Sequence, residues 1–514
     1  MVPLLTRRKS LSNVDAAWLK MEIPTNLMMI TGLFIFDEPL DFERLQTTIA
    51  HRLLRFKRFQ QRVVPARFRS SRWYWEPDPN FDLTYHLDRI TLPPASDEVM
   101  LRGLVNTLMS APLAYDRPLW QFHLIENYGR GCVLLGRMHH CIADGISLIQ
   151  VLLSLTDEEP DAPLAESETG PSQHVNPLGA LLKPVTATVR TGGRVTRKLV
   201  GESLETLTHP TRLVDLAKLG ADGAASLARL TLRPPDQKTL FKGALDVAKR
   251  AAWSEAVPLA EVKAIGQAVG GTVNDVLLTA MTGALRRYLQ GRGEPVEGLN
   301  FRAAVPVNLR PFEDGVNLGN KFGLVFLSLP VGLADPIERV FEFKRRMAAL
   351  KGSTEAVVAF GILNVIGFSP QQIQDMAVNM FGSKATCVMT NVPGPRQTLY
   401  FAGKPIRTMM FWAPQSGRLG LGVSLLSYAG EVRLGVATDA GLAPDPETII
   451  ENFHLEFAEF RRLVGLAESK TEAQTSPAAT ASDGPRHCQA LTKSGQPCKN
   501  QARPDSRFCY VHQK

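Results

Sequence analysis

The chain has 514 residues, 44% of them hydrophobic, and a formal net charge of +8 at pH 7. This length favours two to four domains with hydrophobic cores, and the mild positive charge suits an anionic lipid or nucleic-acid surface without selecting either. No apolar run reaches the roughly 18–20 residues that span a bilayer, and the basic N-terminus lacks the apolar stretch of a secretory signal. Six cysteines are too sparse for a disulfide scaffold, which indicates a reducing, cytoplasmic compartment.

Residues 1–160 have the pattern of one α/β unit. A strand is expected over residues 27–40, followed by a helix over residues 41–56 with Asp41 as its N-cap. The apolar stretches 120–128 and 132–143 predict two neighbouring strands. Apolar residues at helical spacing then predict a helix over residues 145–155.

The junction between that second strand and the helix carries two adjacent histidines, His139 and His140, followed by Asp144 and Gly145. Neighbouring side chains on a strand point to opposite faces, so the two histidines should have different roles, and a shared metal site is not favoured. A neutral imidazole there can act as a general base near pH 7, because its ordinary pKa is about 6.5. The alternative is a buried histidine with a satisfied N–H. Asp144 lies close to a turn and is expected to hold the loop, paired with a cation elsewhere.

Residues 161–235 are expected to form a crossover linker. Within it, residues 176–200 carry five cations and no acid: Lys183, Arg190, Arg194, Arg197 and Lys198. A polybasic, partly apolar stretch of this kind predicts weak, salt-sensitive docking on anionic lipid. The alternative is a solvent-exposed connection between two halves.

A second α/β unit is predicted over residues 236–466. It has a buried helix at 272–290, strands at 301–310, 321–331 and 385–395, a hairpin turning at Ala429-Gly430, and a closing amphipathic helix at 445–464.

The C-terminal end has a different composition. Residues 467–486 are a low-complexity linker that is expected to be disordered. Residues 487–514 then hold three of the six cysteines, in the pattern Cys488-x9-Cys498-x10-Cys509-x2-His512. Three thiolates and one imidazole are the ligands of a tetrahedral structural Zn²⁺ site. The segment also resembles a short Cys/His tail appended to otherwise unrelated proteins, and the alternative is an unstructured tail with stray thiols.

Several segments of residues 10–466 together resemble the bacterial wax ester synthase/diacylglycerol acyltransferase family. They are the opening LSNVDAAWLKMEIPTN, the Pro-Leu-Trp at residues 118–120, HHCIADG, the Asn-Asp-Val at residues 274–276, and TNVPGP. The resemblance implies two α/β halves of the chloramphenicol-acetyltransferase (CoA-dependent acyltransferase) type, packed as a pseudodimer around a central tunnel. It implies transfer of a long-chain acyl group from acyl-CoA to diacylglycerol or a fatty alcohol, without a catalytic cofactor, at a membrane or lipid-droplet surface.

The same resemblance assigns roles around His140. It implies that His140, at the four-residue spacing from Asp144, removes the hydroxyl proton, whereas His139 faces the other way and packs structurally beside the substrate site. Asp144 would hold the loop through an arginine, for which Arg310 is the candidate. Gly145 is expected to allow the tight junction.

Two further residues are assigned to the substrate. Asn274 is a candidate donor to the developing oxyanion, with the alternative that it caps its helix. Asp275 is expected to be structural. Trp120 is a candidate for excluding water from the thioester, with plain core packing as the alternative. No P-loop or dinucleotide fingerprint is present to hold the CoA phosphates, so surface Lys and Arg are expected to do so.

Two rival functions remain open. One is another enzyme of the same fold, such as a peptide-synthetase condensation domain or a polyketide-associated acyltransferase, although the Pro-Leu-Trp and Asn-Val-Pro-Gly-Pro segments argue against it. The other is a zinc-containing nucleic-acid-binding protein, which the positive charge and the Cys/His tail favour. Salt-dependent DNA binding without acyl transfer would select it.

Overall fold

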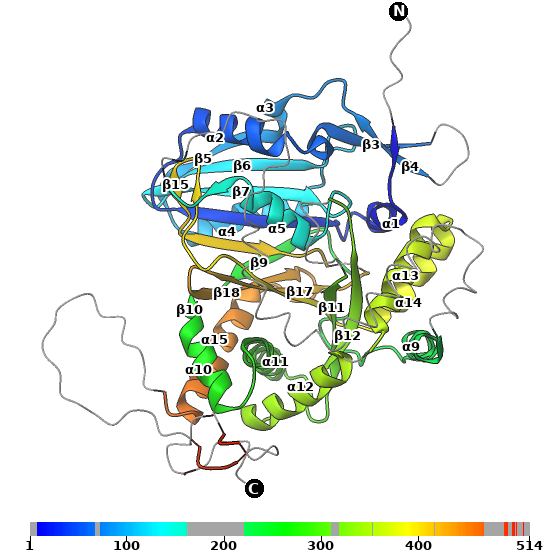
Figure 1. The fold of residues 1–514 in the computed structure, drawn as a ribbon, viewed down its shortest axis with the longest axis vertical. Coiled ribbons are helices and arrows are strands. Elements are labelled where there is room, and N and C mark those ends of the chain that lie inside the picture. The colour runs from blue at the N-terminus through cyan, green and yellow to red at the C-terminus, as the bar shows by residue number, and fades with distance from the viewer. Residues whose placement is uncertain are drawn as a thin grey trace, which may run out of the picture.

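The computed structural model describes residues 8–66, 72–160, 162, 220–309, 318–351, 353–415, 417–466, 488–491, 496–498, 500 and 507. Two α/β halves lie one above the other in Figure 1, the first in blue to cyan and the second in green to orange. Each half is built on its own sheet, so the predicted α/β class is confirmed.

The first half begins with a small sheet and ends with the segment around His140. Its elements are β1 (Lys9–Ser10), α1 (Asn13–Met21), β2 (Met29–Phe36), α2 (Phe42–Thr48), a π-turn (Ile49–Leu53), a 3₁₀-turn (Lys57–Gln60), β3 (Gln61–Pro65), β4 (Trp73–Pro77), α3 (Leu83–His86), β5 (Leu87–Ser96), α4 (Glu98–Ser110), β6 (Trp120–Tyr128), β7 (Gly131–His139), α5 (Gly145–Leu153) and β8 (Thr156–Asp157). Asp41 caps α2 as predicted, accepting a hydrogen bond from Arg44 N at 2.7 Å.

The second half contributes most of the long helices. Its elements are α9 (Gly220–Leu232), β9 (Lys249–Trp253), β10 (Val257–Pro258), α10 (Leu259–Ala268), α11 (Val273–Gly291), β11 (Phe301–Asn308), β12 (Phe322–Leu329), α12 (Pro336–Lys351), α13 (Glu355–Phe368), α14 (Gln371–Ser383), β13 (Cys387–Pro393), β14 (Tyr400–Phe401), β15 (Lys404–Pro405), β16 (Thr408–Trp412), β17 (Leu421–Tyr428), β18 (Glu431–Asp439) and α15 (Pro446–Leu463). The predicted hairpin is confirmed, with Ala429 and Gly430 both at positive φ in a two-residue turn.

Strand pairing crosses between the halves at two places, where β14 pairs antiparallel with β8 and where β16 joins the first sheet. The first sheet has the order β16-β2-β7-β6-β5, so β16, from the second half of the chain, forms its edge by pairing antiparallel with β2. The second sheet has the order β10-β18-β17-β13-β11-β12, with β9 also paired to β18. Helix α9, within the segment expected to be a linker, packs against α13 of the second half. The halves are therefore interleaved more than a division at residue 236 suggests.

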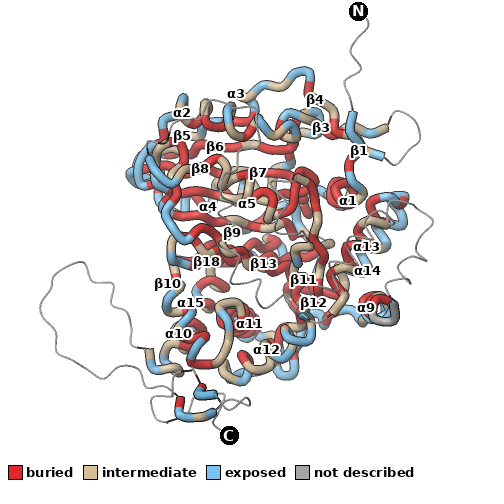
Figure 2. Tube along the Cα trace, in the orientation of Figure 1, coloured by how far each residue is buried: buried red, intermediate tan, exposed pale blue. Residues whose placement is uncertain are grey.

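Most residues along the strands of both sheets are buried (Figure 2). The alternation of β2 places Phe34 in one core cluster and Ile35 in another, on the opposite face of the sheet. The cluster with Ile35 also contains Trp253 and Trp412 of the second half, whose rings lie 5.7 Å apart. The two halves therefore share a hydrophobic core, which fixes the position of one against the other.

Among the described residues, no single helix has the length and apolar composition to cross a bilayer. Helices α12 and α13, bent by 61° at their junction, meet that criterion only as a pair, by length and composition alone.

Candidate active site

His140 lies in the turn between β7 and α5, directly after the last residue of the strand. Its backbone N donates to the Met28 carbonyl at 2.7 Å, which fixes the turn against the start of β2. Its imidazole stacks on Trp18 of α1, with ring centroids 4.1 Å apart, and lies 5.5 Å from the ring of Phe322 on β12. The side chain is thus enclosed by residues from both halves and is only 7% exposed.

This enclosure decides the protonation state of His140. Burial lowers the pKa of the imidazole to about 4, although the charge of Asp144 acts in the opposite direction. The ring is therefore neutral at pH 7, which is the form that accepts a proton. Ring atom Nδ1 is buried and has no hydrogen-bond partner among the described residues.

Asp144 holds the turn through two backbone N–H groups. Its Oδ1 accepts from Ser147 N at 2.9 Å and so caps α5, and its Oδ2 accepts from Lys321 N of the second half at 3.0 Å. The prediction that Asp144 holds the loop is confirmed by these contacts. Its proposed partner Arg310 lies outside the described residues, so that pairing stays a prediction.

Asn320, next to Lys321, reaches the other side of the same turn. Its Nδ2 donates to the carbonyl of His140 and to Oδ1 of Asp15, both at 2.8 Å. The segment 319–321 thus joins the turn of the first half to its helix α1. Sequence reasoning missed Trp18, Asn320 and Lys321, because they approach His140 only through the tertiary fold.

His139 turns away from His140. Its Nδ1 accepts from Cys141 N at 3.0 Å, and its Nε2 lies 3.1 Å from Glu22 Oε2. Glu22 also accepts a hydrogen bond from the hydroxyl of Tyr115 at 2.8 Å. Burial raises the pKa of Glu22, but the contacts with His139, the Met28 backbone N and Tyr115 keep it below its ordinary value. These contacts support the structural role of His139, whose ring is fully buried, and its placement beside the substrate stays a prediction.

Gly145 does not have the role predicted for it. It begins α5 without a positive φ, and a Cβ built on it would meet no atom within 4 Å. Neither backbone strain nor crowding therefore requires glycine at this junction.

Trp120 belongs to the core. It is 0% exposed, its Nε1 donates to the Phe59 carbonyl at 2.8 Å, and its ring stacks on His86 at 4.4 Å. These contacts support the core alternative for Trp120, and none of them supports a substrate-binding role.

Asn274 lies in the first turn of α11, where Thr272 is the N-cap and forms a capping box with Asp275. The capping role is therefore wrong for Asn274, and the structural role of Asp275 is confirmed. The side chain of Asn274 instead faces β13, where its Oδ1 accepts from Asn391 Nδ2 at 3.0 Å. The Asn274 amide N–H groups make no side-chain contact of this kind within the part of the chain that is described.

The structure describes two of the four predicted zinc ligands. Cys488 and Cys498 are buried near one another and pack with Ala490. Cys509 and His512 lie outside the described residues. Within the described ranges no group of three or more His, Cys, Asp or Glu side chains could hold a metal ion.

A narrow apolar pocket, with a free volume of about 80 Å³, lies beside Trp18. Its walls come from α1, α9, α13, α14 and the strands β11 and β12, with Trp18, Met21, Leu230, Ala304, Leu324, Phe326, Ala359, Ile362, Leu363, Ile366, Val378, Phe381, Gly382, Ala385, Gly417 and Leu419 as the lining residues. Trp18 connects the two features, because its indole stacks on His140 and also lines the pocket.

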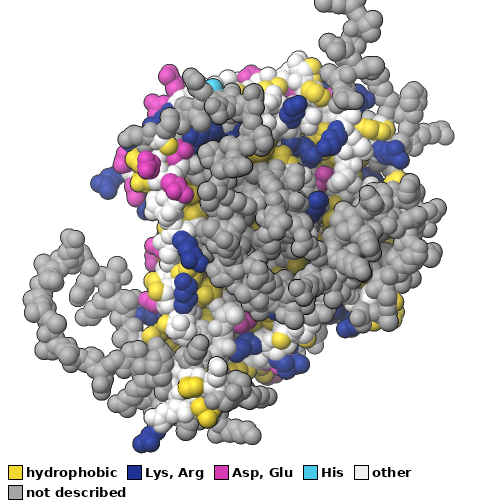
Figure 3. All heavy atoms as spheres, in the orientation of Figure 1, with side chains coloured by type: hydrophobic (Ala, Val, Ile, Leu, Met, Phe, Trp, Pro, Cys, Tyr) yellow, Lys and Arg dark blue, Asp and Glu magenta, His cyan; other side chains and the backbone are white. Residues whose placement is uncertain are grey.

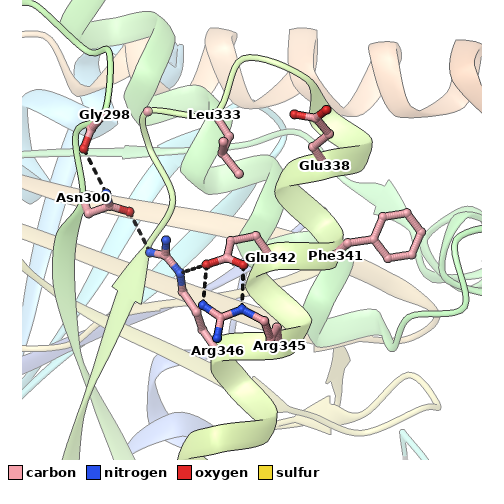
Figure 4. Close-up of a pocket in the computed structure, with 9 residues that line it drawn as sticks. Gly298, Asn300, Leu333, Glu338, Phe341, Glu342, Arg345 and Arg346 are labelled. Atoms are coloured by element: carbon pink, nitrogen blue, oxygen red, sulfur yellow. Dashed lines mark hydrogen bonds and ion pairs between the residues drawn. The ribbon is translucent and has the colours of Figure 1, made fainter.

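A wider hollow of about 550 Å³ lies at the surface beside α12. Figure 4 shows Arg345 and Arg346 turned toward Glu342 at one side of it. Hydrogen bonds from Arg345 hold the pKa of Glu342 down to about 2. This carboxylate pairs with both guanidinium groups, and none of the residues around His140 lines the hollow. It therefore has no part in the candidate site.

Comparison with known proteins identifies related chains. The family model described as wax ester synthase/diacylglycerol acyltransferase catalytic domain matches residues 11–277, and that of the WS/DGAT C-terminal domain matches residues 318–461. A Mycobacterium tuberculosis protein named "Probable diacyglycerol O-acyltransferase tgs1" is 29% identical over 444 residues, covering 85% of this chain and 92% of its own.

Solved structures show the same fold. The wax ester synthase/diacylglycerol acyltransferase from Marinobacter aquaeolei has a TM-score of 0.62 at 22% identity, over 88% of this chain and 99% of its own. The first condensation domain of the CDA synthetase has a TM-score of 0.57 at 16% identity, over 88% of this chain and 96% of its own. At these identities the likeness shows the fold, which condensation domains share.

Proposed function

The chain belongs to the wax ester synthase/diacylglycerol acyltransferase family and is an acyl-CoA-dependent O-acyltransferase, and we propose that His140 is its general base. The acceptor hydroxyl attacks the thioester carbonyl carbon, a C–O bond forms, and the C–S bond breaks. His140 takes the hydroxyl proton and returns it to the departing CoA thiolate. Such proton transfer typically contributes about 10²- to 10⁴-fold to the rate.

The observation that carries this proposal is that Trp18, on which His140 stacks, also lines an apolar pocket. A neutral imidazole and the pocket share one wall, the indole of Trp18. We propose that the pocket receives the hydrocarbon chain of a lipid substrate. It is narrow, and flexible side chains such as Met21 would move aside as the chain enters. Burial of the reacting atoms would also keep water from the thioester.

Asn274 is our candidate donor to the oxyanion. Its carbonyl oxygen is already used by Asn391, which orients the amide N–H groups away from β13. A preorganised donor of this kind stabilises the charge that develops on the thioester oxygen. We also propose that the two halves form a pseudodimer with a tunnel between them, in which acyl-CoA and the acceptor approach His140 from different sides.

The acceptor is proposed to be diacylglycerol, with fatty alcohols as a second substrate class. Both are poorly soluble in water, so we propose peripheral association with a membrane or lipid droplet on the cytoplasmic side. The polybasic residues 176–200 lie outside the described residues. A second support lies on α14, where Ile373, Met376 and Met380 are 50%, 67% and 37% exposed at helical spacing, while the other side of that helix lines the apolar pocket.

We propose acyl transfer rather than binding of nucleic acid, because both family models that match describe wax ester synthase/diacylglycerol acyltransferase domains. On the face shown in Figure 3, the Lys and Arg side chains of the described residues are scattered among other side chains and form no single basic patch. We propose that the Cys/His tail, with Cys488, Cys498, Cys509 and His512, binds one structural Zn²⁺ apart from catalysis.

The test is an acyl-transfer assay with purified protein and radiolabelled palmitoyl-CoA, offering diacylglycerol and a fatty alcohol separately. We expect labelled triacylglycerol from the wild type and none from His140→Ala. His139→Ala is the matched control, which should lower stability through loss of the contact with Glu22 and leave folded protein active. Wild-type turnover in His140→Ala would exclude His140 as the base.

A further inference from the structure

A short chain of contacts connects His140 to a buried carboxylate through one residue of the other half. Asn320 is 4% exposed, and Asp15 of α1 is 2% exposed. Oδ1 of Asp15 accepts from the backbone N of Asn320 at 3.0 Å and from its Nδ2 at 2.8 Å. The same Nδ2 donates to the carbonyl of His140 at 2.8 Å. Both hydrogens of this amide nitrogen therefore have acceptors, which fixes the direction of the Asn320 side chain.

Asp15 is itself held by a cation. Arg58 Nη1 lies 3.8 Å from its Oδ2, and the Arg58 guanidinium lies over the ring of Trp75 at 4.1 Å. Burial raises the pKa of Asp15, while Arg58 and Asn320 act to lower it. A buried carboxylate destabilises the fold unless it has such partners. Asp15 has them in Arg58 and Asn320.

Two buried polar atoms on His140 and Asn320 themselves have no hydrogen-bond partner among the described residues. They are Nδ1 of His140 and Oδ1 of Asn320. Buried polar atoms in proteins are nearly always paired. Nδ1 of His140 can carry a proton, and Oδ1 of Asn320 can accept a hydrogen bond. The two residues are already joined by the bond from Asn320 Nδ2 to the His140 carbonyl. Burial lowers the pKa of His140, whereas the charge of Asp144, the backbone of His140 itself and the side chain of Asn320 act to raise it.

We propose that Asn320 is a positioning residue, whose Oδ1 accepts the Nδ1 proton of His140 through one water and so leaves the lone pair on Nε2. The other tautomer carries its proton on Nε2 and cannot accept one there. Asp15 maintains this arrangement by holding the Asn320 amide in one orientation. The arrangement that positions His140 of the first half therefore forms only when Asn320 of the second half packs against it.

This inference rests on the proposed role of His140 as general base. Loss of the contact should lower kcat about 10- to 100-fold, the equivalent of one or two such hydrogen bonds in the transition state. KM should change less than about threefold, because Asn320 does not touch the substrate.

The experiment uses the full chain labelled with [¹⁵N]histidine, with the His140 signals assigned by their loss in His140→Ala. The wild type should carry its proton on Nδ1 of His140, and Asn320→Ala should show a mixture of tautomers together with the fall in kcat. The matched control is Asn106→Ala. Asn106 of α4 also bonds across the halves, accepting from Ala251 N of β9 at 2.7 Å, so its loss should reduce stability without changing the tautomer or kcat of folded protein.

The outcomes separate this inference from the proposed function. An Asn320→Ala protein with the wild-type tautomer and wild-type kcat overturns the positioning role while His140 stays the base. An active His140→Ala protein overturns the base itself, and the NMR tautomer then still decides whether Asn320 positions the ring. Where Asn320→Ala does not fold, Asn320→Ser fills part of the same space and provides the same two measurements.

Discussion

Replacement of Asp144 by alanine should destabilise the protein through two separate losses. The first is the N-cap of α5, where Oδ1 lies 2.9 Å from Ser147 N, and such caps are worth about 1 kcal/mol. The second is the bond from Lys321 N to Oδ2 at 3.0 Å, and a hydrogen bond to a charged group contributes about 1.5–3 kcal/mol. Because Asp144 is only 4% exposed, the N–H groups that it leaves are buried. We expect a total loss of about 3 kcal/mol.

The assay is urea unfolding followed by tryptophan fluorescence, with acyl transfer measured on the same samples. The matched control is Asp41→Ala, which removes the cap of α2 (Arg44 N to Asp41 Oδ1, 2.7 Å) at an exposed site without an inter-half bond. It should cost about 1 kcal/mol and leave turnover unchanged. Asp144→Asn, which can keep the cap but presents an NH₂ group to Lys321, should fall between the two. Equal losses in Asp144→Ala and Asp41→Ala would refute the inter-half contribution.

Three further outcomes are expected. First, because the pKa of His140 is about 4, kcat/KM should stay level between pH 8 and 6 and fall only toward pH 4. In the unfolded chain the imidazole binds its proton near pH 6.5, so the free energy of unfolding should decline as the pH falls from about 6.5 to about 4. His140→Gln should remove that part of the pH dependence, measured as the urea midpoint. Second, wild type should float with anionic liposomes at low salt, and Met376→Glu on α14 should weaken flotation, whereas Met100→Glu on α4, a position 48% exposed, should not; equal behaviour of the two would place the lipid contact elsewhere. Third, deletion of residues 485–514 should leave acyl transfer unchanged and remove one equivalent of zinc by metal analysis, and an intact, reduced protein without zinc would exclude the module.

What the sequence predicts well is local. The turn at Ala429-Gly430, the cap at Asp41 and the strand–turn–helix segment around His140 each depend on residues within a few positions of one another, where turn chemistry and hydrophobic period act directly. The separate roles of His139 and His140 followed from the same local geometry, because one ends β7 and the other begins the turn.

What the sequence does not predict is pairing across long separations. Asn320 lies 180 positions from His140, and β16 joins β2 across a larger gap. No periodicity or capping signal reports such contacts. The assignments of Trp120 and Gly145 are constrained in the same way, since both rest on position in a motif, whereas burial and free space around each residue are properties of the tertiary fold. Asp15 and Trp18 belong to the opening segment, but the sequence identifies them only as residues of an apolar helix, not as neighbours of the His140 turn.

The low pKa of His140 limits how its catalytic contribution can arise. A general base is most effective when its pKa lies near the working pH, and burial places that of His140 at about 4. Basicity alone therefore cannot account for rapid proton removal, and the gain must come from geometry. A base and a hydroxyl held in a near-attack arrangement reach effective molarities of about 10⁵–10⁸ M in intramolecular reactions. Burial by the rings of Trp18 and Phe322 weakens the base and also fixes its position. Variants that loosen this enclosure should therefore raise the pKa of His140 and still lower kcat, a combination that a role based on basicity alone would not produce.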